Sequence, residues 1–320
     1  MKFKKVFAAL VMFTLLSGMG GCTQSVGEKP YIAVITKATQ SDFWNNVQRG
    51  VNAAATEYNT TVSFEGPENE EDSTTQNELI VKAVANGADA IVLSAIDREK
   101  SADAVKAAVT AGVKIVVIDS GVNSEWVSTI IGTDNLAAGA RAASAVIDGT
   151  KSLEKINIGL INYDRNTENG QLREEGFRNY ISTFSNARVI SSIHVKSNIT
   201  SVSVGVTTML REHPEINVLV GFNEWMTLGI GETIDRLGLK DQVFAVGFDN
   251  NVETIGMLEK GVLDALIVQN PFAIGYLGVE SAYNLVTGNA VQDTTVTQTV
   301  TITQKNMYSS ENQKLLFKFE

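Results

Sequence analysis

The sequence predicts an α/β protein made of two lobes, each a doubly wound parallel β-sheet with helices on both faces. The first reason is that short apolar segments alternate with helical patterns from residue 31 onward. The second is that about ten such strands are many for one open sheet, so two lobes fit better. The third is that several strands end in a polar residue, as at the ligand-binding edge of such sheets.

The first strand–helix unit contains the most informative side chains. Residues 31–35 read YIAVI, which is typical of a strand buried on both faces. A polar turn follows, in which Ser41 or Asp42 can cap the next helix. Phe43 and Trp44 stand at the start of that helix, where they either contact a ligand or pack the helix onto the sheet.

The alternation continues to the end of the chain. Further strands are predicted at 61–64, 90–93, 114–118, 128–132, 156–161, 188–193, 218–221, 243–247 and 263–268. Helices are predicted at 74–86, 101–111, 135–147, 168–183, 202–211, 225–237, 251–259 and 272–286. Residues 294–303 alternate Val or Ile with Thr and are predicted to be extended.

Residues 1–22 are predicted to be a targeting segment and not part of the fold. A lysine-rich start precedes an apolar run at 6–16, which is too short to span a membrane. The run leads to Cys22, the only cysteine of the chain, and resembles a bacterial lipoprotein signal in which this cysteine carries the lipid. The alternative is an ordinary secretory signal with an incidental cysteine. Residues 23–30 would form a tether.

Composition excludes several classes of protein. Cleavage before Cys22 would leave 299 of the 320 residues, and it would move the formal net charge from −10 to −13 because three lysines are lost. Such an acidic chain is a poor partner for nucleic acid. Only four prolines and a hydrophobic content of 44% argue against long disordered regions.

Hydrogen-bonding residues follow several predicted strands. They are Asp119, the segment 133–135, Asn223, Asp249 and Gln269. Each alone is more simply a turn former or a helix cap. Together, at one edge and near two aromatic residues, they suit a neutral polyhydroxyl ligand, because its hydroxyls donate to carboxylates and accept from amides.

Motifs for catalysis are not found. The sequence has no phosphate-binding loop, no dinucleotide fingerprint and no nucleophile elbow. The two histidines are not at metal-ligand spacing, so no metal, cofactor or catalytic residue is assigned. A sugar-processing enzyme could use Asp119 and Asp249 as an acid/base pair, but we expect a hydrogen bond from Arg173 to keep such a carboxylate ionised.

The chain resembles the periplasmic sugar-binding proteins of ABC importers, in their ribose-binding-like group. The resemblance covers nearly all of residues 31–303. Its most specific pieces are the segments 42–44, 173–177, 223–226, 246–249 and 268–271. The same fold forms the effector domain of LacI-type repressors, but the start of this chain resembles a lipoprotein signal and not a helix-turn-helix.

The resemblance implies two lobes joined by three crossover segments, with a ligand cleft between them. The first lobe would comprise residues 31–133 and 270–298, and the second 134–269 and 299–320. The chain would cross near 133–134, 269–270 and 298–299.

The resemblance also implies the ligand contacts. They are Phe43, Trp44 and Asp119 from the first lobe, Arg173, Asn223 and Asp249 from the second, and Gln269 at the hinge. Three positions depart from the family pattern: Ser41 replaces an asparagine, Ser120 an arginine, and a position near Ser197 an aromatic residue. With Trp44 in place of a phenylalanine, these changes suggest a larger pocket, and hence a hexose or another polyol in place of ribose.

The sequence therefore predicts a monomeric, non-enzymatic solute-binding protein outside the cytoplasmic membrane, anchored by a lipid on Cys22. It would capture a monosaccharide or similar polyol between closing lobes and deliver it to an ABC permease. The alternative is a sensor subunit that presents its closed form to a membrane histidine kinase or chemoreceptor.

Overall fold

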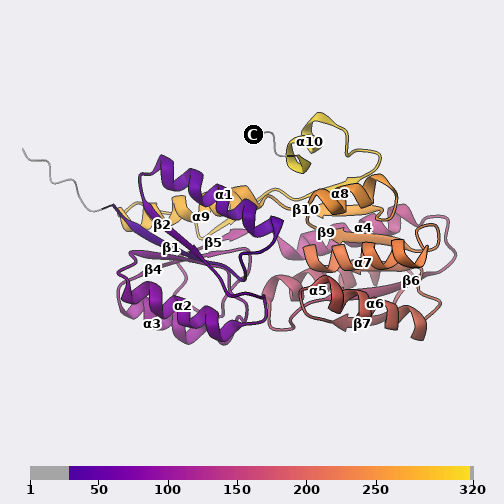
Figure 1. Cartoon of the computed structure of the whole chain (residues 1–320), viewed down its shortest axis with the longest axis horizontal. Helices are drawn as coiled ribbons and strands as arrows, with labels where there is room; N and C mark the ends of the chain where they lie inside the picture. Colours follow the sequence, from indigo (N-terminus) through magenta and orange to yellow (C-terminus); the bar gives the residue numbers. More distant parts are fainter. Residues whose placement is uncertain (1–28, 318–320) are drawn as a thin grey trace, which may run out of the picture.

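The computed structural model describes residues 29–317, which form two lobes lying side by side (Figure 1). Each lobe is built on a six-stranded sheet. The predicted fold class, two α/β lobes with mainly parallel sheets, is confirmed. The predicted targeting segment and Cys22 lie outside the described residues. In residues 29–317 no helix has both the length and the apolar character that crossing a bilayer requires.

The first lobe has an all-parallel sheet in the order β11-β5-β4-β3-β1-β2. Its strands are β1 (Tyr31–Ile35), β2 (Thr61–Glu65), β3 (Ala90–Leu93), β4 (Lys114–Ile118), β5 (Thr129–Gly132) and β11 (Thr294–Val296). The helices that pack on it are α1 (Asp42–Glu57), α2 (Ser73–Ala85), α3 (Ala102–Thr110) and α9 (Pro271–Val286).

The second lobe has the sheet order β12-β10-β9-β8-β6-β7, and β12 alone runs antiparallel to its neighbour. Its strands are β6 (Ile156–Asn162), β7 (Ala187–His194), β8 (Val218–Gly221), β9 (Phe244–Phe248), β10 (Ala265–Val268) and β12 (Val300–Thr303). Its helices are α4 (Asn135–Gly149), α5 (Glu168–Ile181), α6 (Ile199–Glu212), α7 (Glu224–Leu237) and α8 (Val252–Glu259), and α10 (Ser310–Leu316) follows β12.

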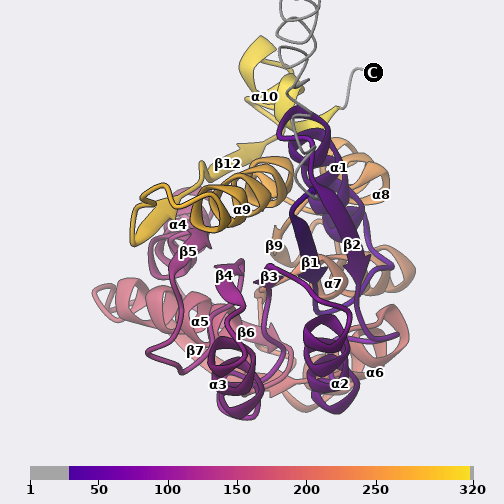
Figure 2. The same ribbon diagram turned by 90° about the vertical axis from the view of Figure 1, so that its left-hand side faces the viewer.

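Strand β1 shows why the predicted strands consist of uninterrupted apolar residues. Its side chains alternate between the two faces of the sheet. Ile32 and Val34 join the core under α1 and α9, whereas Ala33 and Ile35 join the core under α2 and α3. Figure 2 shows these two helix layers on opposite sides of the strands. Because both faces are covered, the strand has no polar position.

The chain passes between the two sheets three times. The crossings lie between β5 and α4, between β10 and α9, and between β11 and β12. The segments are hydrogen-bonded to one another: Thr133 Oγ1 donates to Gln269 Oε1 (2.7 Å), and the Thr297 amide donates to the Gly132 carbonyl (2.7 Å). The three crossing segments therefore lie together and form the hinge between the lobes.

Two helix pairs approach closely through reciprocal glycines. In the α1–α9 pair, a Cβ on Gly50 would collide with the Phe272 carbonyl, and one on Gly275 with the Val47 carbonyl. In the α4–α5 pair, Gly139 lies against the carbonyl of Arg173, and Gly176 lies against the carbonyl of Leu136. No side chain fits at these crossings, because a backbone carbonyl cannot rotate out of the way.

We predict that Gly139→Ala lowers the free energy of unfolding by about 1–3 kcal/mol, the usual cost of overpacking a tight contact. Gly256→Ala in α8 is the matched control, since a Cβ there meets nothing within 4 Å. Alanine in a helix is favoured over glycine by up to about 1 kcal/mol, so the control should be neutral or stabilising. Urea denaturation measures both, and equal stability of the two variants would contradict the prediction.

Candidate functional site

A cavity lies between the two lobes, at the carboxyl ends of the strands of both sheets. The lining residues come from both lobes and from one crossing segment. They are Lys37, Ser41, Phe43, Trp44, Glu70, Asp119, Tyr163, Asn169, Arg173, Asn223, Glu224, Trp225, Asp249 and Gln269. A ligand in this cavity would therefore contact both lobes at once.

Most of the residues that the sequence predicted as ligand contacts are brought together here. The cavity is lined by Ser41, Phe43, Trp44, Asp119, Arg173, Asn223, Asp249 and Gln269. Ser120 is not among the lining residues; it is fully buried, and its hydroxyl has no hydrogen-bond partner among the described residues. Ser197 lines a neighbouring cleft instead.

Asp119 forms a buried ion pair with Lys37. The two side chains are 5% and 2% exposed, and Nζ lies 3.0 Å from Oδ2. Burial acts to raise the pKa of Asp119, but the charges of Lys37 and Arg173 outweigh it and hold that pKa below its ordinary value. Asn169 of the second lobe accepts from Lys37 (3.4 Å) and donates to both carboxylate oxygens (3.1 Å each).

Arg173 on α5 is fully buried and is fixed by neutral acceptors. Nε donates to Asn135 Oδ1 (2.9 Å), Nη1 to the Phe222 carbonyl (2.8 Å) and Nη2 to Gln269 Oε1 (2.9 Å). The guanidinium carbon lies 4.6 Å from the centre of the Phe248 ring. These contacts hold the planar guanidinium group in one orientation at the wall of the cavity.

The expectation that Arg173 binds and ionises Asp249 is wrong. Among the described residues no ion pair joins the two, and Asp249 instead accepts from Gln269 Nε2 (2.6 Å). Burial raises the pKa of Asp249 to about 7, although the charge of Arg173 acts to lower it. Of the two aspartates in the cavity, Asp119 is therefore ionised and Asp249 titrates near neutrality.

Asp119 and Asp249 occupy corresponding places in the two lobes. Each follows a strand, β4 or β9, and each has a positive φ, 56° and 67°. Their amides donate to Ile131 and Ile267 on the next strand of each sheet (3.0 Å in both cases). Aspartate tolerates this left-handed conformation better than most residues, and such conformations gather at functional sites.

Glu224 on α7 connects the second lobe to the first lobe across the cavity. Its carboxylate accepts from the backbone amides of Asp42 (3.3 Å) and Phe43 (3.2 Å) at the start of α1, and from Asn251 Nδ2 (2.8 Å). A helix N-terminus favours an anion in this position. Burial nevertheless raises the pKa of Glu224.

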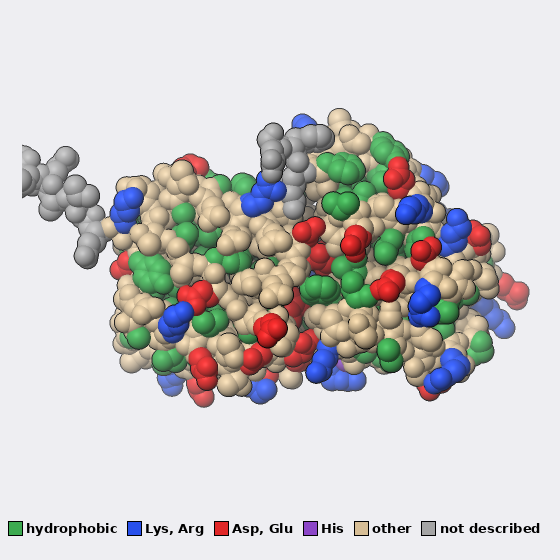
Figure 3. Space-filling model, in the orientation of Figure 1, with side chains coloured by type: hydrophobic (Ala, Val, Ile, Leu, Met, Phe, Trp, Pro, Cys, Tyr) green, Lys and Arg blue, Asp and Glu red, His purple; other side chains and the backbone are tan. Residues whose placement is uncertain are grey.

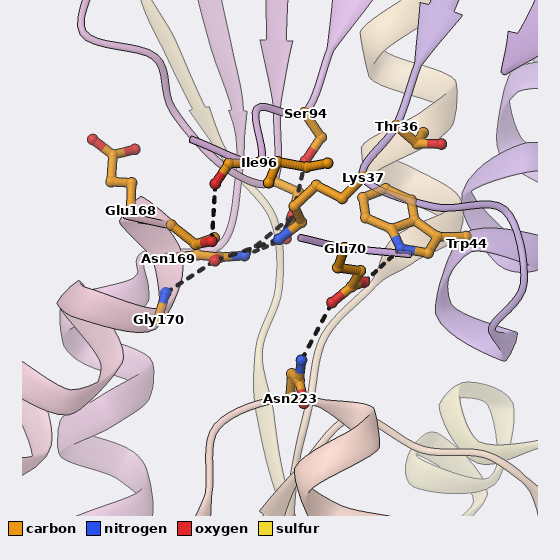
Figure 4. A network of polar contacts seen from close by, with 12 residues as sticks. Thr36, Lys37, Trp44, Glu70, Ser94, Ile96, Glu168, Asn169, Gly170 and Asn223 are labelled. Atoms are coloured by element: carbon orange, nitrogen blue, oxygen red, sulfur yellow. Dashed lines mark hydrogen bonds and ion pairs between the residues drawn. The ribbon is translucent and has the colours of Figure 1, made fainter. Parts of the chain in front are cut away.

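A second carboxylate bridges the lobes on the aromatic side of the cavity. Glu70, from the β2–α2 loop, accepts from Trp44 Nε1 (2.9 Å) and from Asn223 Nδ2 (3.4 Å), as Figure 4 shows. The rings of Phe43 and Trp44 meet edge to face, with centroids 4.9 Å apart. Both rings are at least nine-tenths buried.

Six lining residues were not predicted from the sequence: Lys37, Glu70, Tyr163, Asn169, Glu224 and Trp225. Lys37 carried a usable signal, because it lies two residues after β1, near the strand end where polar residues were expected. Glu224 and Trp225 lie directly after Asn223, at the start of α7, so their proximity could have been inferred. Glu70 and Asn169 reach the cavity only through tertiary folding.

A model of the periplasmic binding protein domain matches residues 32–290. The chain belongs to the periplasmic binding protein family. The family predicted by resemblance is thus confirmed. Among curated relatives, the ribose import binding protein of Bacillus subtilis is 26% identical over 267 residues, which cover 82% of this chain and 84% of the relative. The D-ribose/D-allose-binding protein of Pseudomonas aeruginosa is also 26% identical and covers 82% of this chain and 83% of its own.

Solved structures of this family share the fold. A carbohydrate transporter solute-binding protein from Agrobacterium radiobacter, in complex with D-arabinose, is 27% identical with a TM-score of 0.88, over 90% of this chain and 99% of its own. An ABC transporter solute-binding protein from Agrobacterium vitis with bound D-fucose is 30% identical with a TM-score of 0.86, over 90% of this chain and 100% of its own.

We predict that the stability of the sugar-free protein falls as pH rises from about 4 to about 7, in part through Asp249. Its pKa is 3.8 ordinarily and about 7 in the fold, so the folded state binds the extra proton in this window and loses that advantage as pH rises. Asp249→Asn keeps the shape and removes the charge. Thermal denaturation across pH should show a flatter profile for the variant, and parallel profiles would contradict the prediction.

Proposed function

We propose that the protein captures a neutral monosaccharide or similar polyol between its two lobes and delivers it to an ABC permease. The observation that carries this proposal is the composition of the cavity. It combines a buried ammonium and a guanidinium, four carboxyl groups and several amides with the rings of Phe43 and Trp44. Sugar-binding relatives in the same family support the choice of ligand class.

The polar groups suit hydroxyls because each hydroxyl can both donate and accept. Asp119 is an acceptor at all physiological pH values, and Asn223 and Arg173 supply donors. Asp249, with its pKa near 7, accepts when ionised and donates when protonated. The rings of Phe43 and Trp44 supply apolar surface for the carbon face of a sugar ring.

Capture would proceed by closure of the lobes around the hinge segments. Contacts between the lobes, such as Lys37–Asn169 and Glu70–Asn223, form only when the carboxyl ends of both sheets meet. A ligand that touches both lobes adds contacts that exist only in the closed state, and so shifts the equilibrium toward closure. One chain supplies the complete cavity, so we propose that it works as a monomer.

The family implies that the protein acts outside the cytoplasmic membrane. The relative from Bacillus subtilis is a ribose import binding protein, which supports transport over sensing or catalysis. We further propose that a lipid on Cys22 holds the protein at the membrane. Cys22→Ser should then move the protein from the membrane fraction to the soluble fraction; equal partition of both forms would exclude the anchor.

A thermal-shift screen of residues 23–320 against pentoses, hexoses and inositols, with hits titrated by calorimetry, tests the function. A ligand at 100 times its dissociation constant adds about 2.7 kcal/mol to stability, which is readily measured. We expect one or a few stereochemically related sugars to bind without turnover. A screen in which no sugar stabilises the protein would reject the sugar-binding function, and turnover of a bound sugar would indicate an enzyme.

We predict that Lys37→Met weakens binding of that sugar roughly 10- to 100-fold, which corresponds to about 1.5–3 kcal/mol. The change keeps the apolar stem but removes the ammonium 3.0 Å from Asp119. Lys151→Met is the control, since that side chain is 73% exposed and forms a surface ion pair with Asp148. Unchanged affinity in Lys37→Met would show that this residue does not shape the binding site.

A further inference from the structure

The strongest unassigned feature is a second cleft beside the inner cavity. Its walls come from both lobes: the turn after β1, the β2–α2 loop, the segment before α6 and the start of α7. The lining residues are Ala38, Gln40, Glu68, Asn69, Glu70, Glu71, Lys196, Ser197, Asn198 and Trp225. We call this space the outer cleft.

Two residues separate the outer cleft from the inner cavity. Glu70 and Trp225 line both spaces, so they form the boundary between them. Glu70 lies between Trp44 of the inner cavity and Asn223 of the second lobe (Figure 4). A ligand that occupied both spaces would have to pass between the carboxylate of Glu70 and the indole ring of Trp225.

Closure also builds the outer cleft. Glu71 of the β2–α2 loop accepts a hydrogen bond from the backbone amide of Ser197 in the second lobe (2.6 Å). The hydroxyl of Ser197 is buried in the cleft wall and has no hydrogen-bond partner among the described residues. Any group bound here would therefore contact both lobes, as the inner ligand does.

The wall chemistry selects the class of group that fits. Trp225 is half-buried and offers ring surface, and the amides of Gln40, Asn69 and Asn198 can donate to and accept from hydroxyls. The walls carry three carboxylates, Glu68, Glu70 and Glu71, and one ammonium, Lys196, so a negatively charged ligand would be repelled. Figure 3 likewise shows acidic side chains along the boundary between the lobes.

We propose that the outer cleft is a second sugar subsite, and that the ligand is a neutral disaccharide or glycoside. One ring would occupy the inner cavity, the glycosidic bond would pass between Glu70 and Trp225, and the second ring would lie against Trp225. This inference rests on the proposed sugar-binding function and names its substrate class. A uronic acid or a phosphorylated sugar in the second position would bind poorly.

Calorimetry on residues 23–320 with matched ligands tests the proposal. The pairs are D-glucose with cellobiose and maltose, D-galactose with lactose and melibiose, and D-xylose with xylobiose. Methyl and p-nitrophenyl glycosides extend the set to D-ribose and L-arabinose. We expect at least one neutral extended ligand to bind 10-fold or more tightly than its free sugar, and its uronate or phosphate analogue to lose that gain.

Gln40→Trp places a bulky ring in the outer cleft, away from the inner cavity. The variant should lose the gain for the extended ligand and keep the affinity for the free sugar. Gln242→Trp is the matched control, at an exposed position between α7 and β9 at the opposite ends of the strands. It should bind both ligands as the parent does.

The outcomes separate the two claims. If free sugars bind and no extended ligand binds more tightly, the second subsite is rejected while the sugar-binding function stands. The same holds if Gln40→Trp weakens the free sugar and the extended ligand equally. If neither free nor extended sugars bind, the proposed function itself fails, and the second subsite with it.

Discussion

The closed cleft depends on burying the Lys37–Asp119 ion pair without leaving either charge incompletely bonded. Taking two charges out of water is costly, and the cost is recovered only when the geometry is good and the remaining donors and acceptors are satisfied. Asn169 meets this need from the other lobe, by accepting from Lys37 and donating to Asp119. The electrostatics of the first lobe are thus completed only by the second, which couples the binding chemistry to closure.

The two lobes repeat one backbone design with opposite electrostatics. Asp119 and Asp249 share a strand-end position, a positive φ and an amide bonded to the next strand. Lys37 lowers the pKa of the first, whereas burial raises that of the second to about 7. A ligand would therefore meet a fixed acceptor on one side and, on the other, a carboxyl group that adapts its protonation to the bound hydroxyl.

Much of the fold was accessible from the sequence because buried parallel strands have a simple signature. A strand whose two faces are both buried carries apolar residues at successive positions, as at 31–35, and shows no alternation of polar and apolar residues. This pattern predicted sheets covered by helices on both faces. The polar residue after each strand predicted Asp119, Asn223 and Asp249, since strand ends share one edge. Glu70 and Asn169 could not be predicted, because a loop residue and a helix residue reach the cavity only through the packing of distant segments.

The partner of Asp249 was predicted incorrectly for a related reason. The sequence analysis expected Arg173 to donate to a carboxylate, whereas Arg173 donates to Asn135, a backbone carbonyl and Gln269. Neutral acceptors are common in sequence and carry no distinguishing pattern. Whether a buried cation binds a carboxylate or an amide is decided by orientation, and orientation appears only in three dimensions.

The glycine contact at Arg173 separates two properties of that residue. Gly139 touches its backbone carbonyl, not its side chain, so the placement of position 173 is fixed by the crossing of α4 and α5. The guanidinium makes a separate contact with α4, because its Nε donates to Asn135 at the start of that helix. A substitution at position 173 would therefore leave the glycine contact in place and remove the bonds that tie the side chain to α4 and to the hinge residue Gln269.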